Sequence, residues 1–408
     1  MKKIIITYFC AFIYVFAAGN GSPYSILGFG EYAQNFNSRI YGLGGLGYAW
    51  ADKFSLNGIN PASNANLLIP RLEGSMLYTG LNLKDNNSTF YSNANVNGIV
   101  LGVPLERDFG LSITTGFLPQ TNIKNTYRDK YFKNGYKFEF ENNGGLSKYF
   151  LSIASSFNSN YSFGVSLDYL IFDKNQMSRV YNEDYNLTNA EYKTNYHFNH
   201  INYTLGFIAY KLNEYLNIKE LKDLRFGATF SPEFTKSADT IVNLRTFRGE
   251  QIGSDYSQSI EISKGKLDYK KPLEYGIGLS AYFDEYTIGF DYRFINTKKM
   301  LNKQNKFNDY QKIAIYLEYQ KEKPRSYWQA IPLRFALSYE KTPYTIDNKD
   351  VNAISFYSGA SLPLSKESSI DIGISYGLRG SNTKLKEQII NFNIGFGFSE
   401  IWFIREEK

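Results

Sequence analysis

The chain has 408 residues and a net charge of +6, with 45 basic and 39 acidic side chains. Because basic and acidic side chains are almost balanced and no dense basic run is present, the charge argues against nucleic-acid binding. Aromatic residues make up 17% of the chain, including 35 tyrosines and 32 phenylalanines. A chain rich in tyrosine and glycine without a second long apolar run is typical of a transmembrane β-barrel, where only every second residue meets lipid.

Residues 1–19 read as a secretory signal peptide, in which two lysines precede the apolar run 4–18 and small residues around Gly19 fit cleavage. The single cysteine, Cys10, lies inside it, so disulfides, thiolate metal sites and a cysteine nucleophile are excluded from the mature protein. No other stretch reaches the roughly 18 apolar residues of a spanning helix. We therefore expect export to the outer membrane of a Gram-negative bacterium.

The segment 41–63, YGLGGLGYAWADKFSLNGINPAS, lacks the alternation of the rest of the chain and contains five glycines. Glycines permit positive φ angles and close backbone approach, and a proline holds the preceding residue extended and fixes a corner. Such a segment suits a plug folded inside a barrel; the alternative is an ordinary extension before the first strand. The candidate gate residues are Gly44, Gly45, Asn60, Pro61 and Ala62.

From about residue 72 onward, apolar residues alternate with polar or small ones, so each strand has one apolar and one polar or small face. The repeated glycine, serine and charge of the second face suggest a wet interior. The predicted strands lie near 72–84, 92–105, 109–118, 146–157, 161–173, 199–212, 222–234, 268–283, 285–296, 308–320, 328–341, 351–364, 368–380 and 387–400.

The connections between these fourteen strands alternate in length. We interpret 119–145, 174–198, 235–267 and 297–307 as long polar loops, with a hairpin at 127–140, and most of the others as short turns. Long extracellular loops, short periplasmic turns and an even strand number define outer-membrane barrels. The prediction is an all-β, 14-stranded antiparallel transmembrane β-barrel with an N-terminal hatch in its lumen, divided into a signal peptide 1–19, a hatch 20–70 and a barrel 71–408.

The last strand alternates Ile390, Phe392, Ile394 and Phe396 with asparagine and glycine, and the following segment 401–403 supplies aromatics for an interfacial girdle. A final aromatic-ended strand resembles the signal read by the barrel-assembly machinery, which we expect as a partner during insertion. The charged tail after residue 403 departs from a strictly C-terminal phenylalanine.

Several short motifs resemble the FadL-like long-chain fatty acid transporters of the outer membrane. The motifs are Ser22-Pro23-Tyr24-Ser25, Gly44-Gly45, Asn60-Pro61-Ala62-Ser63 and the glycine pair within 141–147. The resemblance is specific over 22–66 and architectural over the rest. It implies a fourteen-stranded barrel whose hatch carries the Asn-Pro-Ala element, a lateral exit that the residues do not locate, and passive uptake of hydrophobic small molecules such as long-chain fatty acids.

Two functions stay open at this point. In the first, a hydrophobic ligand from outside is captured above the hatch and passes when the hatch moves, since each buried CH₂ contributes about 0.8 kcal/mol. In the second, the same kind of barrel is an outer-membrane component of a protein secretion or attachment system. The expected surroundings are outer-membrane lipid and a monomeric barrel, without nucleic acid.

Alternation places arginines and carboxylates on the lumen side. One arginine could bind the acidic head group of a ligand through its planar fork. Alternatively, the charges form a mutual ion network that seals the wall and docks the hatch. The arginines are Arg225, Arg293, Arg334 and Arg379, and the carboxylates are Asp168, Asp291, Glu318, Glu340 and Asp371.

Catalysis is not expected. The only histidines, His197 and His200, are three residues apart, a spacing that points them to opposite faces of an extended chain, so they do not form a metal pair with a carboxylate such as Glu191. A barrel hydrolase would need a histidine at the lumen or rim, and His200 is the one candidate. The glycines of 42–47 lack the strand–loop–helix context of a dinucleotide loop. We expect no enzyme, cofactor or metal.

Overall fold

A computed structural model of the chain describes residues 21–26, 28–85, 88–184, 187–248, 258–299, 307–365 and 367–399. The predicted signal peptide, with Cys10, and the predicted girdle 401–403 lie outside these residues. No helix among the described residues is long and apolar enough to cross a membrane.

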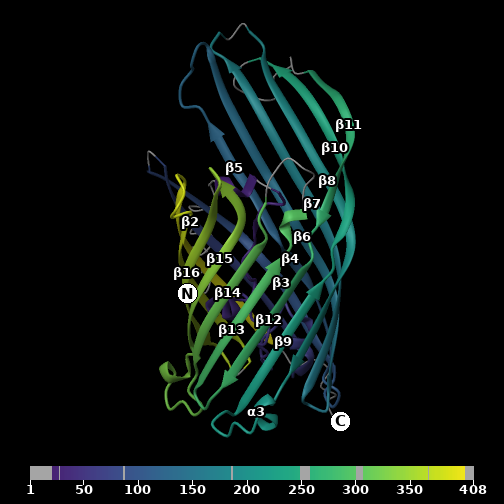
Figure 1. Cartoon of the computed structure of the whole chain (residues 1–408), viewed down its shortest axis with the longest axis vertical. Helices are drawn as coiled ribbons and strands as arrows, with labels where there is room; N and C mark the ends of the chain where they lie inside the picture. The colour runs from purple at the N-terminus through teal and green to yellow at the C-terminus, as the bar shows by residue number, and fades with distance from the viewer. Residues whose placement is uncertain are drawn as a thin grey trace, which may run out of the picture.

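Fourteen strands form a closed antiparallel wall, in which each strand pairs with its neighbours in sequence order and β18 pairs with β2. This confirms the predicted fold class (Figure 1). The wall strands are β2 (Arg71–Lys84), β3 (Ser88–Glu106), β4 (Leu111–Pro119), β6 (Tyr136–Phe157), β7 (Tyr161–Asn182), β8 (Asn189–Ala209), β9 (Asp223–Ser231), β12 (Glu274–Tyr282), β13 (Tyr286–Ile295), β14 (Tyr310–Tyr319), β15 (Leu333–Ile346), β16 (Lys349–Pro363), β17 (Ser369–Arg379) and β18 (Lys386–Ser399).

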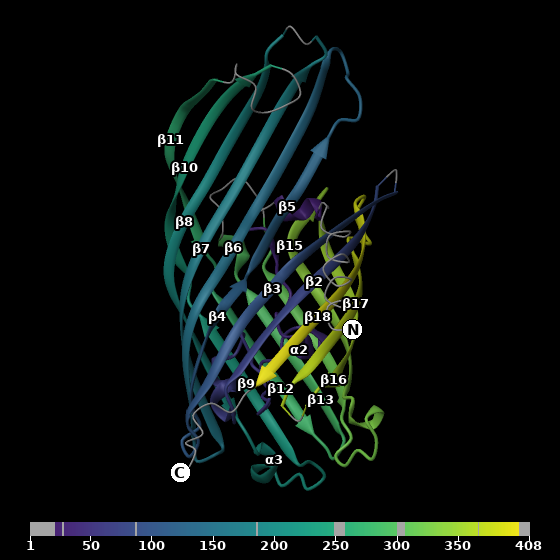
Figure 2. The ribbon, with the colours of Figure 1, turned by 180° about the vertical axis from the view of Figure 1, so that it is seen from behind.

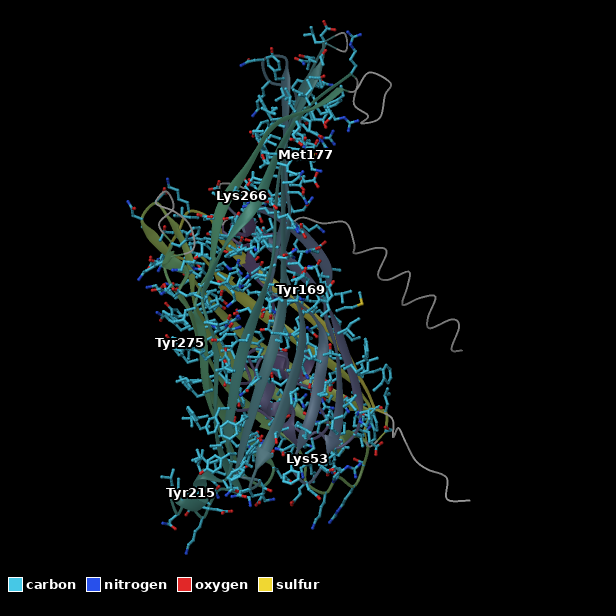
Figure 3. All side chains as sticks on the ribbon, turned by 90° about the vertical axis from the view of Figure 1, so that its right-hand side faces the viewer. Lys53, Tyr169, Met177, Tyr215, Lys266 and Tyr275 are labelled. Carbon is cyan, nitrogen blue, oxygen red and sulfur yellow. The ribbon has the colours of Figure 1, made fainter. Side chains whose placement is uncertain are left out.

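The outer face of the wall is a band of exposed apolar side chains. In β7, Phe163, Val165 and Leu167 are exposed, whereas the intervening Ser162 and Ser166 are buried toward the lumen. This order is the reverse of a water-soluble barrel and matches a wall that faces lipid. Figure 3 shows Tyr169 and Tyr275 along the body of the barrel, well below Met177 and Lys266 and above Tyr215.

Three of the segments predicted as loops are strands. The segment 119–145 contains β5 (Thr121–Arg128) and the start of β6, while 174–198 continues β7 and β8. The segment 235–267 forms most of β10 (Phe234–Phe247) and β11 (Gln258–Lys271). The predicted hairpin at 127–140 exists, but as the end of the longer β5–β6 pair. Much of the fourth predicted loop, 297–307, lies outside the described residues.

These strands build a six-stranded extension, the crown, in the order β5, upper β6, upper β7, upper β8, β10 and β11. The crown rises from one side of the barrel far above the opposite rim (Figures 1 and 2). Pro119 is the last residue of β4, before β5, while Pro232 lies between β9 and β10 and Pro272 between β11 and β12. Proline lacks the N–H that a ladder needs, which explains why the strands break there.

A row of alternating charges crosses the outer face of the crown. In the strand registers Arg128 faces Glu139, Glu139 faces Arg179, Arg179 faces Glu191 and Glu191 faces Arg245. Arg179 lies 2.7 Å from Glu191 and 3.5 Å from Glu139. Opposite charges on neighbouring strands stabilise a sheet. These segments were predicted as loops because they are polar. A strand outside the lipid needs no apolar face, so no alternation marks it in the sequence.

The N-terminal segment 21–70 fills the lumen and is called the plug below. Its elements are short: η1 (Pro23–Ile26), β1 (Glu31–Tyr32), α2 (Ser38–Gly42) and η2 (Pro61–Asn66). The strand β1 pairs with β5, and the Asn37 side chain accepts from the N–H groups of Arg39 and Ile40 to cap α2. Outside the plug, α3 (Leu212–Tyr215), η3 (Thr297–Lys299) and η4 (Trp328–Ala330) lie in connections between strands.

Candidate functional site

The plug packs directly against glycines of the wall. A Cβ atom on Gly227 would lie 2.1 Å from the Tyr48 carbonyl oxygen, and one on Gly276 would lie 2.0 Å from the Tyr48 ring. A Cβ atom on Gly164 would lie 2.5 Å from the Pro61 carbonyl carbon, and one on Gly206 would lie 2.8 Å from the Pro61 ring. The glycine-rich face was interpreted from sequence as the lining of a wet interior, and here this interpretation is wrong. The glycines allow dry contact between the plug backbone and the sheet.

The glycine pair of the plug is used for backbone shape. Gly44 and Gly45 have φ angles of 85° and 80°, which side-chain-bearing residues rarely adopt, and a Cβ on Gly44 would lie 2.8 Å from Ala314. The turn they form delivers the N–H groups of Gly47 and Tyr48 to the buried Asp291 carboxylate, at 2.8 and 3.1 Å. A wall strand thus holds the plug by its backbone.

The Asn60-Pro61-Ala62 corner begins η2. Asn60 is extended, as expected before a proline, and its side chain accepts from the Ala62 N–H at 3.1 Å. The same amide donates to the Tyr48 carbonyl at 2.7 Å and to the wall at the Phe207 carbonyl at 3.2 Å. The corner therefore joins two parts of the plug to β8.

Two further asparagines carry the plug fold, and the sequence analysis did not single them out. The Asn57 amide donates to the carbonyls of Gly47 and Trp50, and its oxygen accepts from the Asn60 N–H. Asn64 binds both backbone groups of Asn57. The spacing Asn57, Asn60 and Asn64 around a proline was the available signal, because buried irregular backbone needs side-chain partners.

Ion pairs add to this anchoring. In α2, Arg39 binds Asp371 of β17 at 3.2 Å and Asp52 of the plug at 3.3 Å. Near the start of the plug, Glu31 forms an ion pair with Arg379, which also lies 3.1 Å from Glu387. These ion pairs therefore tie the first half of the plug to β17 of the wall.

The four arginines proposed as head-group ligands all face the lumen, and each has a carboxylate partner. Arg225 binds Asp223 at 2.6 Å, and Arg334 binds Glu318 at 2.8 Å. These pairings fit the mutual ion network, while binding of a head group stays a prediction. The remaining pairs are Arg293 with Glu274 at 2.7 Å and Arg379 with Glu31 and Glu387.

A chamber of about 610 Å³ lies beside the first part of the plug, from which Ser22 and Tyr32 line it, and it reaches through the wall. Its lining includes the lumen side chains of Tyr357 and Asn391 together with Val96, Phe117 and Tyr149 of the outer face.

On this side, backbone pairing between β3 and β4 begins only at Ile99 and Phe117, within the described residues. Higher up, β5 rises into the crown while β3 slants away (Figure 2). The Lys124 ammonium bridges to Asn93 at 2.8 Å across this gap.

The histidines are not brought together. His197 lies opposite Asp173 and binds it at 2.6 Å, whereas His200 lies opposite Leu170 and stacks on Phe234, with ring centroids 3.8 Å apart. Glu191 is paired with Arg179. Among the described residues, no group of three or more His, Cys, Asp or Glu side chains could hold a metal ion.

The wall, plug and side gap define the class of FadL-type outer-membrane barrels. The fold is similar to a Pseudomonas aeruginosa FadL homologue, with TM-score 0.63 and 12% identity over 91% of this chain and 99% of that one. It is also similar to the monoaromatic hydrocarbon channel CymD (TM-score 0.61, 14% identity, 90% and 98% covered) and the Ralstonia pickettii toluene transporter TbuX (0.58, 13%, 90% and 98%).

Within this class the chain belongs to the BamG family, whose family model matches residues 1–407. The sequence-based resemblance to FadL-like transporters is thus confirmed for the fold, while the family is BamG. No curated protein matches the chain in sequence.

Proposed function

We propose that this chain is a plugged outer-membrane barrel that serves as a protein-binding component of an outer-membrane protein assembly or secretion system. The observation that carries the proposal is the crown, a sheet of six strands that stands above one side of the barrel and leaves the opposite rim low (Figure 1). Uptake of a small molecule needs no such wall outside the membrane.

The inner face of the crown favours a protein partner. Phe138, Phe140 and Tyr192 are 39%, 42% and 47% exposed, although the registers place them on the same face as Phe172, which is buried against Phe29 of the plug. Exposed aromatic side chains on a rigid sheet above the membrane are a typical protein-binding surface. The edge strands β5 and β11 frame this face, and the plug covers the lower end of β5 through β1 and Gly21.

The rigid plug is consistent with this role. Gly227, Asp291 and Asn60 hold plug backbone at the wall, and the ion pairs of Arg39 and Glu31 add anchors on β17. A sealed lumen preserves the permeability barrier while the outside of the barrel binds other proteins. No catalytic step is part of the proposal.

The test is purification of the full chain in mild detergent at its natural level, followed by mass spectrometry of proteins and of extracted small molecules. We expect stoichiometric outer-membrane assembly or export proteins, and a loss of them with F138S/F140S on the inner face of the crown. L187S at the crown tip, where Leu187 is also exposed, is the matched control. Purification of the chain alone, with a bound alkyl ligand, would contradict the proposal.

A second candidate, passive uptake of hydrophobic molecules, is favoured by the chamber and its side gap. A molecule from outside would enter the chamber and leave into the membrane between β3 and β5, with the plug as the floor. If this is the function, deleting 41–63 in an intact barrel changes hydrophobic uptake, and bulky residues at Val96 and Phe117 block it. Unchanged uptake in both variants would exclude this candidate.

A further inference from the structure

The chamber beside the plug is divided into a polar inner part and an apolar outer part. Neutral hydrogen-bonding side chains line the inner part, whereas the outer part ends among Val96, Phe117 and Tyr149 of the outer face. Its volume of about 610 Å³ is that of a small-molecule site. The neutral polar residues of the inner part include Thr79, Asn93, Asn95, Ser355, Tyr357 and Asn391.

The edge of β3 separates the two parts. Asn95 and Val96 are consecutive residues of this strand and therefore point to opposite faces. Asn95 lies opposite Leu77, which packs inside the lumen, whereas Val96 is 49% exposed on the outer face. Among the described residues, β3 has no ladder partner on the β4 side above Ile99, so its N–H and C=O groups there are open to a ligand. A molecule that crosses this edge meets polar groups inside and apolar side chains outside.

The lumen side of this edge carries four neutral side chains, Thr79, Asn93, Asn95 and Asn391, called the amide patch below. Asn93, Thr79 and Asn391 lie opposite one another in the registers of β3, β2 and β18. Thr79 donates to the Asn391 side-chain oxygen at 2.7 Å, and the Asn391 amide donates to Ser375 at 3.2 Å. Asn95 is only partly buried and makes no hydrogen bond to another described side chain, so its amide is accessible from the chamber.

The charged residues of the lining leave no cation free for an acidic head group. The lining contains three carboxylates and one guanidinium group, that of Arg379. Arg379 already forms ion pairs with Glu31 and Glu387. Lys124 lies at the rim of the side gap, where its ammonium donates to the Asn93 side-chain oxygen at 2.8 Å. A carboxylate or phosphate in the chamber would therefore add to an existing excess of negative charge.

The other two carboxylates of the lining lie away from the amide patch. Asp173 binds His197 at 2.6 Å on the outer face. Glu340 is on β15, separated from β3 by four wall strands, and lies opposite Lys312 in the strand register. The part of the chamber next to the side gap is thus neutral, which suits a ligand whose head group is neutral as well.

We propose that the chamber binds an amphiphile with a neutral, hydroxyl-rich head group, whose hydrocarbon tail passes through the side gap into the membrane. The head group lies against the amide patch, because amides both donate to and accept from the hydroxyls of a sugar or a glycerol. The tail lies between Val96 and Phe117, where its CH₂ groups are removed from water. For the second candidate function, on which any transport role of the site rests, this narrows the ligand to neutral amphiphiles rather than fatty acids.

The experiment compares amphiphiles that have tails of equal length and different head groups: dodecyl glucoside, monolaurin, laurate and dodecylammonium. Each is titrated into the full chain in a zwitterionic detergent, and native mass spectrometry measures the bound fraction. Because the tails are equal, the differences in affinity report the head group. We expect dodecyl glucoside or monolaurin to bind roughly tenfold more tightly than either charged amphiphile, the effect of one or two hydrogen bonds.

Variants locate the bound molecule. N95L removes an amide that has no partner among the described side chains, so it leaves the fold intact, and it should weaken binding of the neutral amphiphile roughly tenfold. V96W fills the side gap and should abolish binding. V165W is the matched control, since Val165 is 54% exposed on the lipid-facing side of β7 and does not line the chamber. K124M removes the cation at the rim and should leave binding of the neutral amphiphile unchanged.

Tighter binding of dodecyl glucoside assigns a sugar head group, and tighter binding of monolaurin assigns a glycerol head group. Laurate or dodecylammonium bound as tightly as the neutral pair would overturn the proposal, as would a loss of neutral binding in K124M. Binding that V96W and V165W weaken equally would also overturn it, because the tail would then lie elsewhere on the lipid-facing surface. Uptake is measured separately: a neutral amphiphile that binds at this site without being taken up excludes the second candidate function and supports the site.

Discussion

The barrel wall and the crown share the strands β6, β7 and β8, yet they are stabilised in opposite ways. In the wall, apolar side chains face outward and glycines face the plug, as at Gly227 beneath Tyr48. In the crown, the outer face carries the ion ladder through Arg179. A Cβ atom added to Gly265 of β11 would have no atom within 4 Å, so this glycine packs against nothing. Lipid and the plug determine the lower halves of these three strands, whereas ion pairs between strands stabilise the upper halves.

The largest effect on this difference between wall and crown is expected from substituting the glycines. We expect G227V to unseat the plug, since its side chain would collide with the Tyr48 backbone, at a cost above the roughly 1–3 kcal/mol of ordinary overpacking. The measurement is ion conductance of the barrel in planar bilayers, which should rise. G265V in the crown is the matched control and should leave conductance unchanged. Low conductance in both variants would show that the plug tolerates a displaced backbone.

A smaller effect is expected at the carboxylate that holds the plug. D291A leaves the N–H groups of Gly47 and Tyr48 without acceptors and should weaken plug docking by about 2–4 kcal/mol. Proteolysis of the plug in the intact barrel measures this. D291N keeps one acceptor oxygen, so the protease resistance of its plug should fall between that of D291A and that of the natural protein. If D291A resists protease as the natural protein does, the glycine contacts alone hold the plug.

In the crown, R179M removes the centre of the ladder and should destabilise the upper sheet by about 2 kcal/mol. The difference should change little in high salt, because the side chains of Arg179, Glu139 and Glu191 are only 9–14% exposed. Hydrogen exchange of β7 and β8 reports it residue by residue. Exchange in the plug should not change. A change that spreads into the plug would mean that crown and wall unfold as one unit.

The smallest effect is expected for H197A. His197 and Asp173 are both about half exposed, and such pairs contribute little. A shift in Tm below the scatter of repeated measurements is the expected result. A loss of stability like that of R179M would show that this pair belongs to the ladder.

The wall could be predicted from sequence because lipid enforces strict alternation, as in Phe163, Val165 and Leu167. The crown could not, because residues such as Arg128, Glu139 and Arg179 carry the composition of loops and their pairing depends on partners distant in sequence. The plug could be located from its glycines, but its asparagine network arises only from folding, because its partners are brought together by the turns. The side gap depends on where a ladder ends, which a single strand does not encode.

Closure of the wall also has a consequence for how the protein forms. Arg71 of the first wall strand binds Ser399 of the last, 328 residues away, so this seam joins segments that are synthesised at opposite times. The plug precedes every strand, yet Ser38 contacts Asn393 of β18. Long-range contacts of this kind form late. Complete docking of the plug therefore requires β18, so we expect it to finish only when the seam between β2 and β18 closes.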